Sequence, residues 1–166
     1  MLSTIYTHFM KFYRGKFRPK NISKYDGDYS NIVYRSMWEY QTLKWCDANP
    51  SVVSYSSEEV VIPYRCATDN RMHRYFMDLK IRFQNGDTYL IEIKPKAQTV
   101  MPKKKSRTTQ KFINEVMTYA KNESKWKAAA ALCEQRGWFF EIWTEETLAK
   151  LGIPLMLKEV KRKSKM

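Results

Sequence analysis

Two carboxylates and a lysine lie close together in a strongly apolar part of the chain. Asp78 follows the run YFM, and Glu92, fourteen positions later, ends the run TYLIEIK together with Lys94. Carboxylate oxygens suit hard cations such as Mg²⁺ or Mn²⁺. A lysine beside such an ion can orient or help to deprotonate a water molecule and can stabilise charge that develops on phosphorus. These residue types therefore provide what metal-assisted hydrolysis of a phosphodiester requires.

The three side chains must share one face of a hairpin if they are to act together. Residues 72–83 and 88–94 read as its two strands, and the Asn85-Gly86 dipeptide between them is a strong turn signal. The alternating apolar residues of both strands are odd-numbered, whereas Asp78, Glu92 and Lys94 are even-numbered. Because side chains alternate across a strand, the three polar residues are expected on the same face.

The length of the loop decides which residues face each other. A three-residue loop, Asn85-Gly86-Asp87, pairs odd positions with odd positions, whereas a two-residue turn mixes the faces. We therefore predict the three-residue register, or an equivalent bulge, which places Asp78 opposite Lys94 and Lys80 opposite Glu92. Two carboxylates this close repel one another unless a cation or a proton lies between them. The alternative is a solvated sheet face with surface ion pairs, against which the apolar character of TYLIEIK argues.

The formal charge of +13 on 166 residues predicts a polyanionic partner. The excess belongs to three segments, 1–24, 94–111 and 158–166, and the rest of the chain is net negative. The middle segment carries seven basic residues and no acid, and it begins at Lys94, so we expect the polyanion to lie across the candidate site. The candidate nucleic-acid contacts are Lys96, Lys103, Lys104, Lys105, Arg107, Lys111 and Arg74, with His73 as a further candidate for phosphate contact.

The elements that must position these residues follow from periodicity and turn signals. We expect a helix that carries Glu39 before the strands, and two helices after the hairpin, of which the second ends at Gly137. The expected elements are helix Val33–Asp47 with a cap at Ser30 or Asn31, strands Val52–Tyr55, Glu59–Tyr64, Met72–Phe83 and Thr88–Lys94, helices Thr108–Ala120 and Ser124–Arg136, strand Trp138–Trp143 and helix Glu145–Leu151. This order predicts a mixed α/β domain with a central sheet flanked by helices. The expected division is a basic and aromatic arm at 1–30, one domain at 31–152 and a basic tail at 153–166.

Several other classes of protein are disfavoured. The longest apolar run, Ala128–Cys133, is far shorter than the roughly 20 residues that span a bilayer, and the first residues lack an apolar secretion signal. Two histidines and three scattered cysteines disfavour a zinc site and a histidine-dependent nuclease. Because the sequence has neither a Gly-rich phosphate loop nor a GxSxG motif, we expect no nucleotide cofactor and no serine-hydrolase chemistry. The shortness of the apolar runs makes us expect no membrane partner.

The same residues carry a resemblance to a known group of nucleases. Asp78 followed by Glu92-Ile93-Lys94 resembles the D…(D/E)xK motif of the restriction-endonuclease-like (PD-(D/E)xK) nucleases, with Met77 where the name of the motif has proline. Glu39 fits the additional helical glutamate common in that superfamily. The layout over residues 34–148, with the runs VVIPY, RYFMDLKI, EIKPK and SKWKAAAALCEQRGWFF, is similar to the endonuclease subunit of heteromeric transposons. Within that branch, the chain resembles the head-completion nucleases of T-even-type tailed phages.

The resemblance implies a restriction-endonuclease-like α/β fold, with a central mixed β-sheet flanked by helices and an αβββαβ core. It also implies a metal-dependent DNA endonuclease of little sequence specificity. It implies that Mg²⁺ or Mn²⁺ is held by Asp78, Glu92, the backbone carbonyl of Ile93 and Glu39. It implies further that Lys94 positions the attacking water, and it makes Gln98 an additional candidate.

The implied biological role is phage head completion and head–tail joining, in which packaged double-stranded DNA is cut or trimmed. Portal or neck proteins would be partners, and the protein would act in the host cytoplasm during assembly and in the virion. Two alternatives share part of the evidence. A basic head–neck structural protein could bind DNA or portal by charge alone, and it would show metal-independent, salt-sensitive DNA binding. An endonuclease subunit of a heteromeric transposase would use the same chemistry with a partner transposase.

Overall fold

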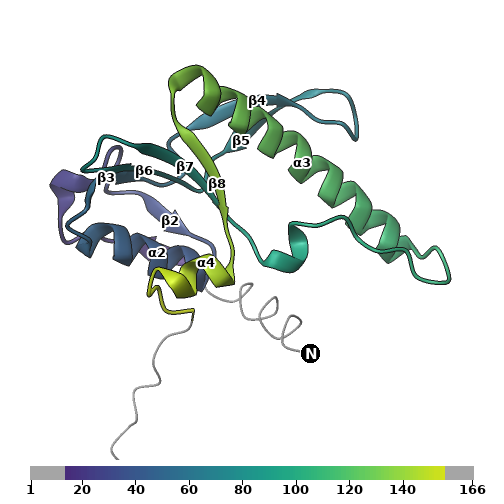
Figure 1. Ribbon diagram of the computed structural model, residues 1–166, viewed down its shortest axis with the longest axis horizontal. Coiled ribbons are helices and arrows are strands. Elements are labelled where there is room, and N and C mark those ends of the chain that lie inside the picture. The colour runs from purple at the N-terminus through teal and green to yellow at the C-terminus, as the bar shows by residue number, and fades with distance from the viewer. Residues whose placement is uncertain (1–13, 156–166) are drawn as a thin grey trace, which may run out of the picture.

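The computed structural model describes residues 14–155 of the chain (Figure 1). Residues 1–13 of the expected arm and the basic segment 158–166 of the expected tail lie outside the described residues, so the predictions made for them stay predictions. No helix within residues 14–155 has both the length and the apolar character needed to cross a membrane.

A four-stranded sheet forms the centre of the structure. Its strands are ordered β3 (Val52–Ser56), β6 (Leu79–Phe83), β7 (Thr88–Ile93) and β8 (Phe139–Trp143). The first three pair antiparallel, and β8 pairs parallel to β7 after the chain has passed through helix α3 (Gln110–Arg136). With helix α2 (Met37–Ala48) before β3, the core has the predicted αβββαβ order and the predicted mixed sheet.

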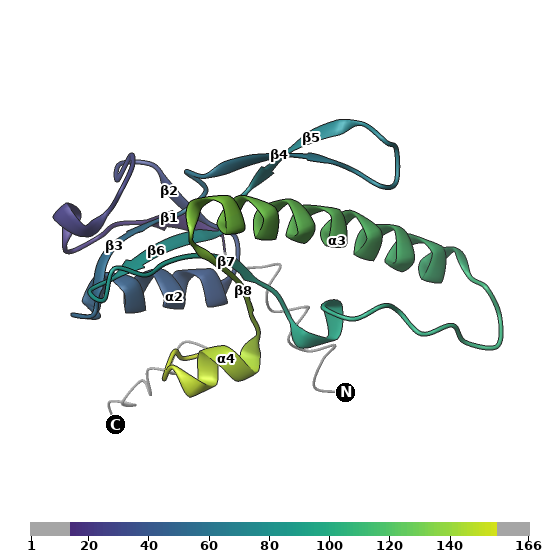
Figure 2. The ribbon, with the colours of Figure 1, turned by 45° about the horizontal axis from the view of Figure 1, so that its top comes forward.

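Two small sheets and three short helices complete the described chain. Strand β1 (Gly15–Phe17) pairs with β2 (Ile32–Tyr34), and β4 (Val61–Arg65) pairs with β5 (Met72–Phe76), each antiparallel. The short helices are the 3₁₀ turns η1 (Ile22–Lys24) and η2 (Lys96–Gln98) and helix α4 (Glu145–Lys150). The β4–β5 hairpin runs alongside α3 (Figures 1 and 2).

The alternation of the central strands places apolar side chains on both faces of the sheet. The odd-numbered residues Leu79, Ile81 and Ile91 are buried in one cluster with residues of α2. Leu90, one position along, is buried in a second cluster with Ala129 of α3. Figure 2 shows α2 and α3 on opposite sides of the strands. Because full burial of one such large aliphatic side chain stabilises the fold by roughly 1.5–3 kcal/mol, this alternation fixes which residues of β7 face α3.

The run Met72–Phe83, which we predicted as one strand, is two strands in different sheets. Strands β5 and β6 are separated by Met77 and Asp78. The Met77 N–H donates to the Val60 carbonyl (2.9 Å), and the Met77 carbonyl accepts from the Glu58 N–H (3.0 Å). Asp78 therefore lies at the crossing from one sheet to the other. The single-strand prediction was wrong because the odd–even alternation continues unchanged through this crossing.

The β6–β7 hairpin pairs odd residues with odd residues, as predicted, through a different three-residue loop. Lys80 faces Leu90. The Phe83 N–H donates to the Asp87 carbonyl (2.9 Å) and closes the loop Gln84-Asn85-Gly86. Gly86 has a φ of 91°, a backbone conformation that glycine adopts without strain.

The observed register is two positions away from the predicted one. The predicted oppositions of Asp78 with Lys94 and of Lys80 with Glu92 are therefore wrong. Continued by one pair beyond β6, the observed register sets Asp78 opposite Glu92. The shift brings the two carboxylates closer to each other than the sequence alone indicated.

Helix α2 begins later than the sequence indicated. It starts at Met37 rather than Val33, because residues Ile32–Tyr34 form strand β2, which pairs with β1. Ser36, and not Ser30 or Asn31, caps the helix by accepting from the backbone N–H three residues on. The cap places Glu39 in the first turn of α2, so the prediction that this acid lies on a helix is confirmed.

The predicted helices Thr108–Ala120 and Ser124–Arg136 are a single helix, α3. No Gly or Pro interrupts the helix, and the Ser124 hydroxyl donates back to the Ala120 carbonyl (3.0 Å). Gly137, in a left-handed conformation with φ 67°, ends α3 as predicted. Helix α3 extends from the end of the loop that follows η2 to the face of the central sheet, and it presents lysines along its length.

Candidate active site

Asp78, Glu92 and Lys94 meet at one edge of the central sheet. The Ile93 N–H donates to Asp78 Oδ2 (2.8 Å), which ties the crossing between the sheets to the end of β7. Lys94 Nζ lies 3.2 Å from Glu92 Oε1, and the two side chains are 20% and 7% exposed. The Lys94 N–H donates to the Trp143 carbonyl (3.0 Å) and extends the β7–β8 pairing. The backbone of two strands thus fixes the positions of all three residues.

Negative charge is concentrated at Asp78. Burial raises the pKa of the Asp78 carboxyl well above its usual range, and the carboxylates of Glu92 and Glu39 raise it further. The Ile93 N–H and the Lys94 ammonium act in the opposite direction. Carboxylates arranged in this way need a cation or a proton between them. All the donors are oxygens, the ligand set that Mg²⁺ and Mn²⁺ prefer, so the residues present fit a divalent-metal site.

Glu39 approaches the site from the N-terminal turn of α2. Its Oε2 accepts from the Arg35 N–H (2.8 Å), and its Oε1 accepts from the Ser36 hydroxyl (3.3 Å). Burial raises the pKa of Glu39, and these two hydrogen bonds partly offset the rise. Arg35 itself pairs with Glu58 through both arms of its guanidinium (3.0 and 3.1 Å). The charge of Glu39 raises the pKa of the Asp78 carboxyl, so the two carboxylates lie near enough to interact.

Glu92 has a further side-chain partner, Tyr75. The Tyr75 hydroxyl donates to Glu92 Oε2, and burial raises the pKa of this phenol, as does the charge of Glu92. Lys125 of α3 places its Nζ 5.4 Å from the centroid of the Tyr75 ring. Sequence reasoning missed both residues. Tyr75 belongs to the apolar alternation, Lys125 is one of several lysines on α3, and no local pattern separates either from its neighbours.

Part of the predicted DNA-binding set surrounds a groove beside α3, which we call the basic groove. The groove has a volume of about 910 Å³ and lies between the loop that follows η2 and the first turns of α3. The predicted residues that line it are Gln98, Lys103, Lys105 and Lys111. Lys104 and Arg107 are exposed in the same loop. Four lysines and one arginine of the predicted set therefore belong to one continuous stretch of surface.

Two other predicted contacts already have partners within the protein. The Lys96 N–H donates to Glu145 Oε2 (2.9 Å), and Lys96 Nζ donates to Glu146 Oε1 (2.7 Å), which joins η2 to the first turn of α4. Arg74 is exposed on β5, with its guanidinium 5.5 Å from the centroid of the Phe76 ring. Arg74 thus lies on the β4–β5 hairpin and not on the loop of the basic groove.

His73 belongs to a small polar cluster at the end of the β4–β5 hairpin. Its Nε2 lies 2.7 Å from Asp69 Oδ2, and both residues are exposed. Together with buried Cys66, they offer donor atoms within 4.8 Å of one another. A hydrogen bond with Thr68 lowers the pKa of the Cys66 thiol. The expectation against a zinc site came from spacing along the chain, and the hairpin brings these residues together in space.

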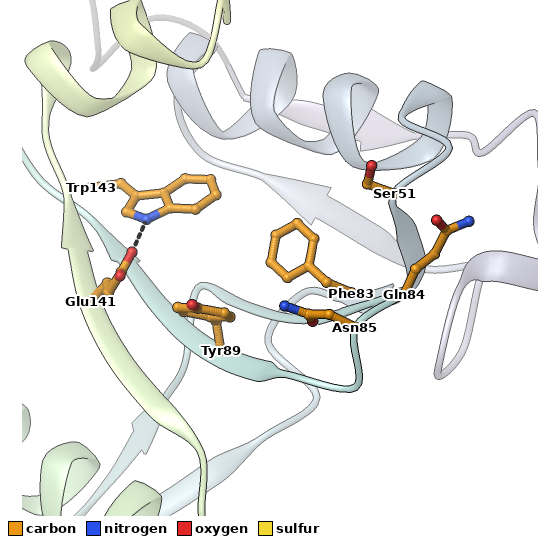
Figure 3. A pocket seen from close by; sticks show the side chains of 7 residues that line it. All are labelled: Ser51, Phe83, Gln84, Asn85, Tyr89, Glu141 and Trp143. Atoms are coloured by element: carbon orange, nitrogen blue, oxygen red, sulfur yellow. Dashed lines mark hydrogen bonds between the residues drawn. The ribbon is translucent and has the colours of Figure 1, made fainter.

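Another cavity, of about 660 Å³, lies between the β6–β7 loop and strand β8 (Figure 3). It is lined by Ser51, Phe83, Gln84, Asn85, Tyr89, Glu141 and Trp143. The Trp143 indole N–H donates to Glu141 Oε2 (2.8 Å) across its wall. None of the predicted site residues lines this cavity, so the carboxylate cluster is separate from it.

Comparison with known proteins is consistent with this geometry. A family model described as the TnsA-like endonuclease N-terminal domain matches residues 49–145, a range that includes Asp78, Glu92 and Lys94. The chain is also similar to the head completion nuclease of Enterobacteria phage T4, with 46% identity over 144 residues that cover 84% of this chain and 96% of the relative. No solved structure matches the chain significantly.

Proposed function

Since the chain belongs to the TnsA-like endonuclease family, in the branch of phage head completion nucleases and with the restriction-endonuclease-like fold, we propose that it is a metal-dependent endonuclease acting on double-stranded DNA. The proposed cofactor is Mg²⁺ or Mn²⁺, and the proposed specificity for sequence is low. The observation that carries the proposal is the pair of facing acids, Asp78 and Glu92, with Lys94 within 3.2 Å of Glu92.

The proposed metal ligands are Asp78, Glu92 and the backbone carbonyl of Ile93, with Glu39 holding a second ion or its water. A bound divalent ion supplies Lewis acidity, which polarises a phosphoryl oxygen and makes a water molecule more acidic. Lys94 is held against Glu92 at the same sheet edge, where its ammonium can orient the attacking water and stabilise negative charge on phosphorus. In this proposal the acids and the Ile93 carbonyl hold the metal, and Lys94 acts on the water and the phosphate.

The proposed DNA path runs from this cluster over the basic groove. Lys94 begins the acid-free basic segment, and the exposed loop residues Lys104 and Arg107 continue it. Lysines without strong protein partners suit contacts to phosphate, which position a duplex without reading its sequence. Arg74, Lys96 and His73 are proposed as secondary contacts, because each already has a partner within the fold.

The proposed role is to cut or trim packaged DNA during head completion and head–tail joining. The T4 relative, which matches most of this chain, is named for head completion. Portal or neck proteins are the proposed partners, and the host cytoplasm and the virion the proposed locations. A transposition role rests on the family model alone, which matches only residues 49–145, so we give it second place.

Cleavage of supercoiled plasmid with Mg²⁺, with Mn²⁺ and with EDTA tests the proposal. We expect nicked and linear products only with a divalent metal, and loss of cleavage in Asp78→Asn and Lys94→Met. The matched controls are Asp26→Asn and Lys127→Met, since both side chains are well exposed, at 60% and 76%. Equal cleavage by all five proteins, or none with either metal, would refute it. Salt-sensitive DNA binding without any cleavage would favour the non-catalytic head–neck protein instead.

A further inference from the structure

The Tyr75 hydroxyl reaches Glu92 from a different sheet. Tyr75 lies on β5, which pairs with β4, whereas Glu92 lies on β7 of the central sheet. The alternation of β5 directs Tyr75 inward, where it is buried, and leaves Arg74 and Phe76 exposed on the outer face. The hydrogen bond from Tyr75 to Glu92 therefore joins two separately paired parts of the chain at the candidate metal site.

This contact differs from those of two other buried tyrosines, Tyr25 and Tyr55. Tyr25 donates to the Ser57 carbonyl (3.2 Å), and Tyr55 donates to Asp47 (2.9 Å), both away from the site. Buried tyrosine hydroxyls generally find a partner, so the existence of a hydrogen bond is ordinary. The partner of Tyr75 is unusual, because it is one of the two carboxylates to which we assign the metal.

The two oxygens of Glu92 are held by different groups. Lys94 Nζ approaches Oε1, and the Tyr75 hydroxyl donates to Oε2. The torsion that rotates a carboxylate is soft, so one contact alone leaves its plane free to turn. Donors on both oxygens fix the plane, and each oxygen keeps a lone pair for a metal. Hydrogen bonds of this kind to ligating side chains typically change metal affinity or activity by about 10–100-fold.

Lys125 supports this arrangement from α3. Its Nζ lies 5.4 Å from the centroid of the Tyr75 ring, and it is half-buried. Lys127, two residues along the same helix, instead points to solvent and pairs with Glu123 (3.2 Å). A cation over a phenol ring is attracted to its π face and makes the hydroxyl a better donor. Lys125 thus contacts the Tyr75 ring, and its ammonium also attracts the Glu92 carboxylate directly.

We propose that Tyr75 is a positioning residue for Glu92, supported by Lys125, and that this pair tunes the affinity of the site for divalent metal. The inference rests on the proposed function, which names Glu92 as a metal ligand. It adds a role for the β4–β5 hairpin and for α3 that the D…ExK pattern does not contain. It also assigns the larger effect to Tyr75, because the Tyr75 hydroxyl is hydrogen-bonded to Glu92, whereas Lys125 contacts the Tyr75 ring and reaches Glu92 by longer-range attraction.

The test compares Tyr75→Phe, which removes only the hydroxyl, with Tyr64→Phe. Tyr64 is a matched control, because it is buried on the neighbouring strand β4 with its ring edge-on to Tyr75 at 6.4 Å. Mn²⁺ binding to the protein without DNA is measured by calorimetry, and plasmid cleavage is measured as a function of Mg²⁺ concentration. For Tyr75→Phe we expect roughly 10-fold weaker Mn²⁺ binding and a similar rise in the half-saturating Mg²⁺ concentration. Tyr64→Phe should leave both unchanged.

Lys125→Met and Lys127→Met form the second pair. Lys125→Met should weaken Mn²⁺ binding by roughly 3-fold, less than Tyr75→Phe does, because loss of the ring contact is partly offset by loss of a positive charge near the metal, and Lys127→Met should have no effect. In the double variant Tyr75→Phe/Lys125→Met, the effects should add less than fully, because part of the effect of Lys125 passes through the hydroxyl. Full additivity would overturn the link between the two residues.

The outcomes separate the inference from the proposed function. If the wild type cleaves DNA and Tyr75→Phe retains its Mn²⁺ affinity and its Mg²⁺ dependence, the inference is wrong and the function stands. If the wild type binds Mn²⁺ with the expected Tyr75 dependence but never cleaves, the inference stands and the function is wrong. If the wild type neither binds Mn²⁺ nor cleaves, both are wrong. Thermal unfolding of every variant identifies losses that come from misfolding, and Tyr75→Phe matching the wild type there confines its effect to the metal site.

Discussion

Asp47 and Asp78 both lie toward the interior of the protein, but their surroundings differ. Asp47, near the end of α2, is buried and accepts hydrogen bonds from three groups. Its oxygens accept from the Lys20 N–H (3.0 Å), the Asn21 N–H (3.2 and 3.3 Å) and the Tyr55 hydroxyl (2.9 Å). The charge of Asp47 is therefore spread over donors that belong to the fold. This carboxylate fastens the N-terminal segment to the helix.

Asp78, by contrast, has few hydrogen-bond donors and more negative charge nearby. The structure gives it one backbone donor, the Ile93 N–H, while Glu92 and Glu39 add negative charge nearby. A buried acid with enough donors stabilises the fold, whereas buried acids that face one another destabilise it unless a cation joins them. Hydrogen-bond satisfaction thus distinguishes Asp47 from Asp78, the proposed metal ligand, more clearly than burial does.

Substitution of Asp78 gives the largest expected effect. Asp78→Asn should lower the rate of DNA cleavage by roughly 10³-fold, the upper range for loss of one charged group at a reacting centre. It should leave the unfolding midpoint in urea unchanged or higher, since the substitution relieves repulsion with Glu92. A variant that loses activity and stability together would place Asp78 in the same class as Asp47 and break the distinction.

Asp47→Asn should show the reverse pattern. An amide at this position presents N–H groups toward backbone N–H donors, so the free energy of unfolding should fall by about 3 kcal/mol. Urea denaturation measures the loss. Cleavage per folded molecule should equal that of the wild type, and a rate reduced beyond the unfolded fraction would mean that the clamp at Asp47 also shapes the site.

Added Mg²⁺ should distinguish the two acids without measuring catalysis. A ligand that binds only the folded state at 100 times its dissociation constant stabilises it by about 2.7 kcal/mol. We therefore expect Mg²⁺ to raise the melting temperature of the wild type and of Asp47→Asn but not that of Asp78→Asn. Calcium serves as a second ion, because it shares the preference for oxygen ligands. An equal shift in Asp78→Asn would locate the metal elsewhere.

The comparison of Asp47 with Asp78 also shows which features of the structure the sequence can predict and which it cannot. The succession of helix, strands, helix and strand, the faces of the hairpin and the cluster of Asp78, Glu92 and Lys94 follow from alternation, turn residues and spacing, which are local properties, whereas the αβββαβ core was implied by the family resemblance. The crossing at Met77 does not follow from local properties, because it depends on hydrogen bonds to Val60 and Glu58, residues far back along the chain. Local alternation is identical on both sides of that crossing.

The register and the supporting residues also depend on distant partners. Turn chemistry alone does not decide between loops that start at Gln84 and at Asn85, although the choice moves every pairing by two positions. Tyr75 reads as a core residue until its hydroxyl is seen on Glu92. In the sequence, Asp47 is an ordinary residue at a helix end. Its hydrogen bonds from the Lys20 and Asn21 N–H groups are visible only in the structure. Spacing predicted the cluster of Asp78 and Glu92, and the hydrogen bonds that distinguish Asp47 from Asp78 become visible only in the three-dimensional structure.

The cap of α2 gives the smallest expected effect and tests whether Glu39 belongs with Asp78. Ser36 caps α2 by accepting from the Glu39 N–H (3.2 Å), and its hydroxyl also donates to the Glu39 carboxylate (3.3 Å). Thr109 caps α3 in the same way by accepting from the Phe112 N–H (3.1 Å), without an acid of the site. Ser36→Ala and Thr109→Ala should each lower the free energy of unfolding by about 1 kcal/mol, the usual effect of losing a helix cap.

Only Ser36→Ala should also slow DNA cleavage, by a few-fold, because it frees one oxygen of Glu39 to turn away from Asp78 while the Arg35 N–H still holds the other. Chemical denaturation and plasmid cleavage on the two variants, side by side, separate the cap from the site. If Ser36→Ala and Thr109→Ala lose equal stability and neither changes the rate, Glu39 is a capping residue whose position near Asp78 has no part in the chemistry.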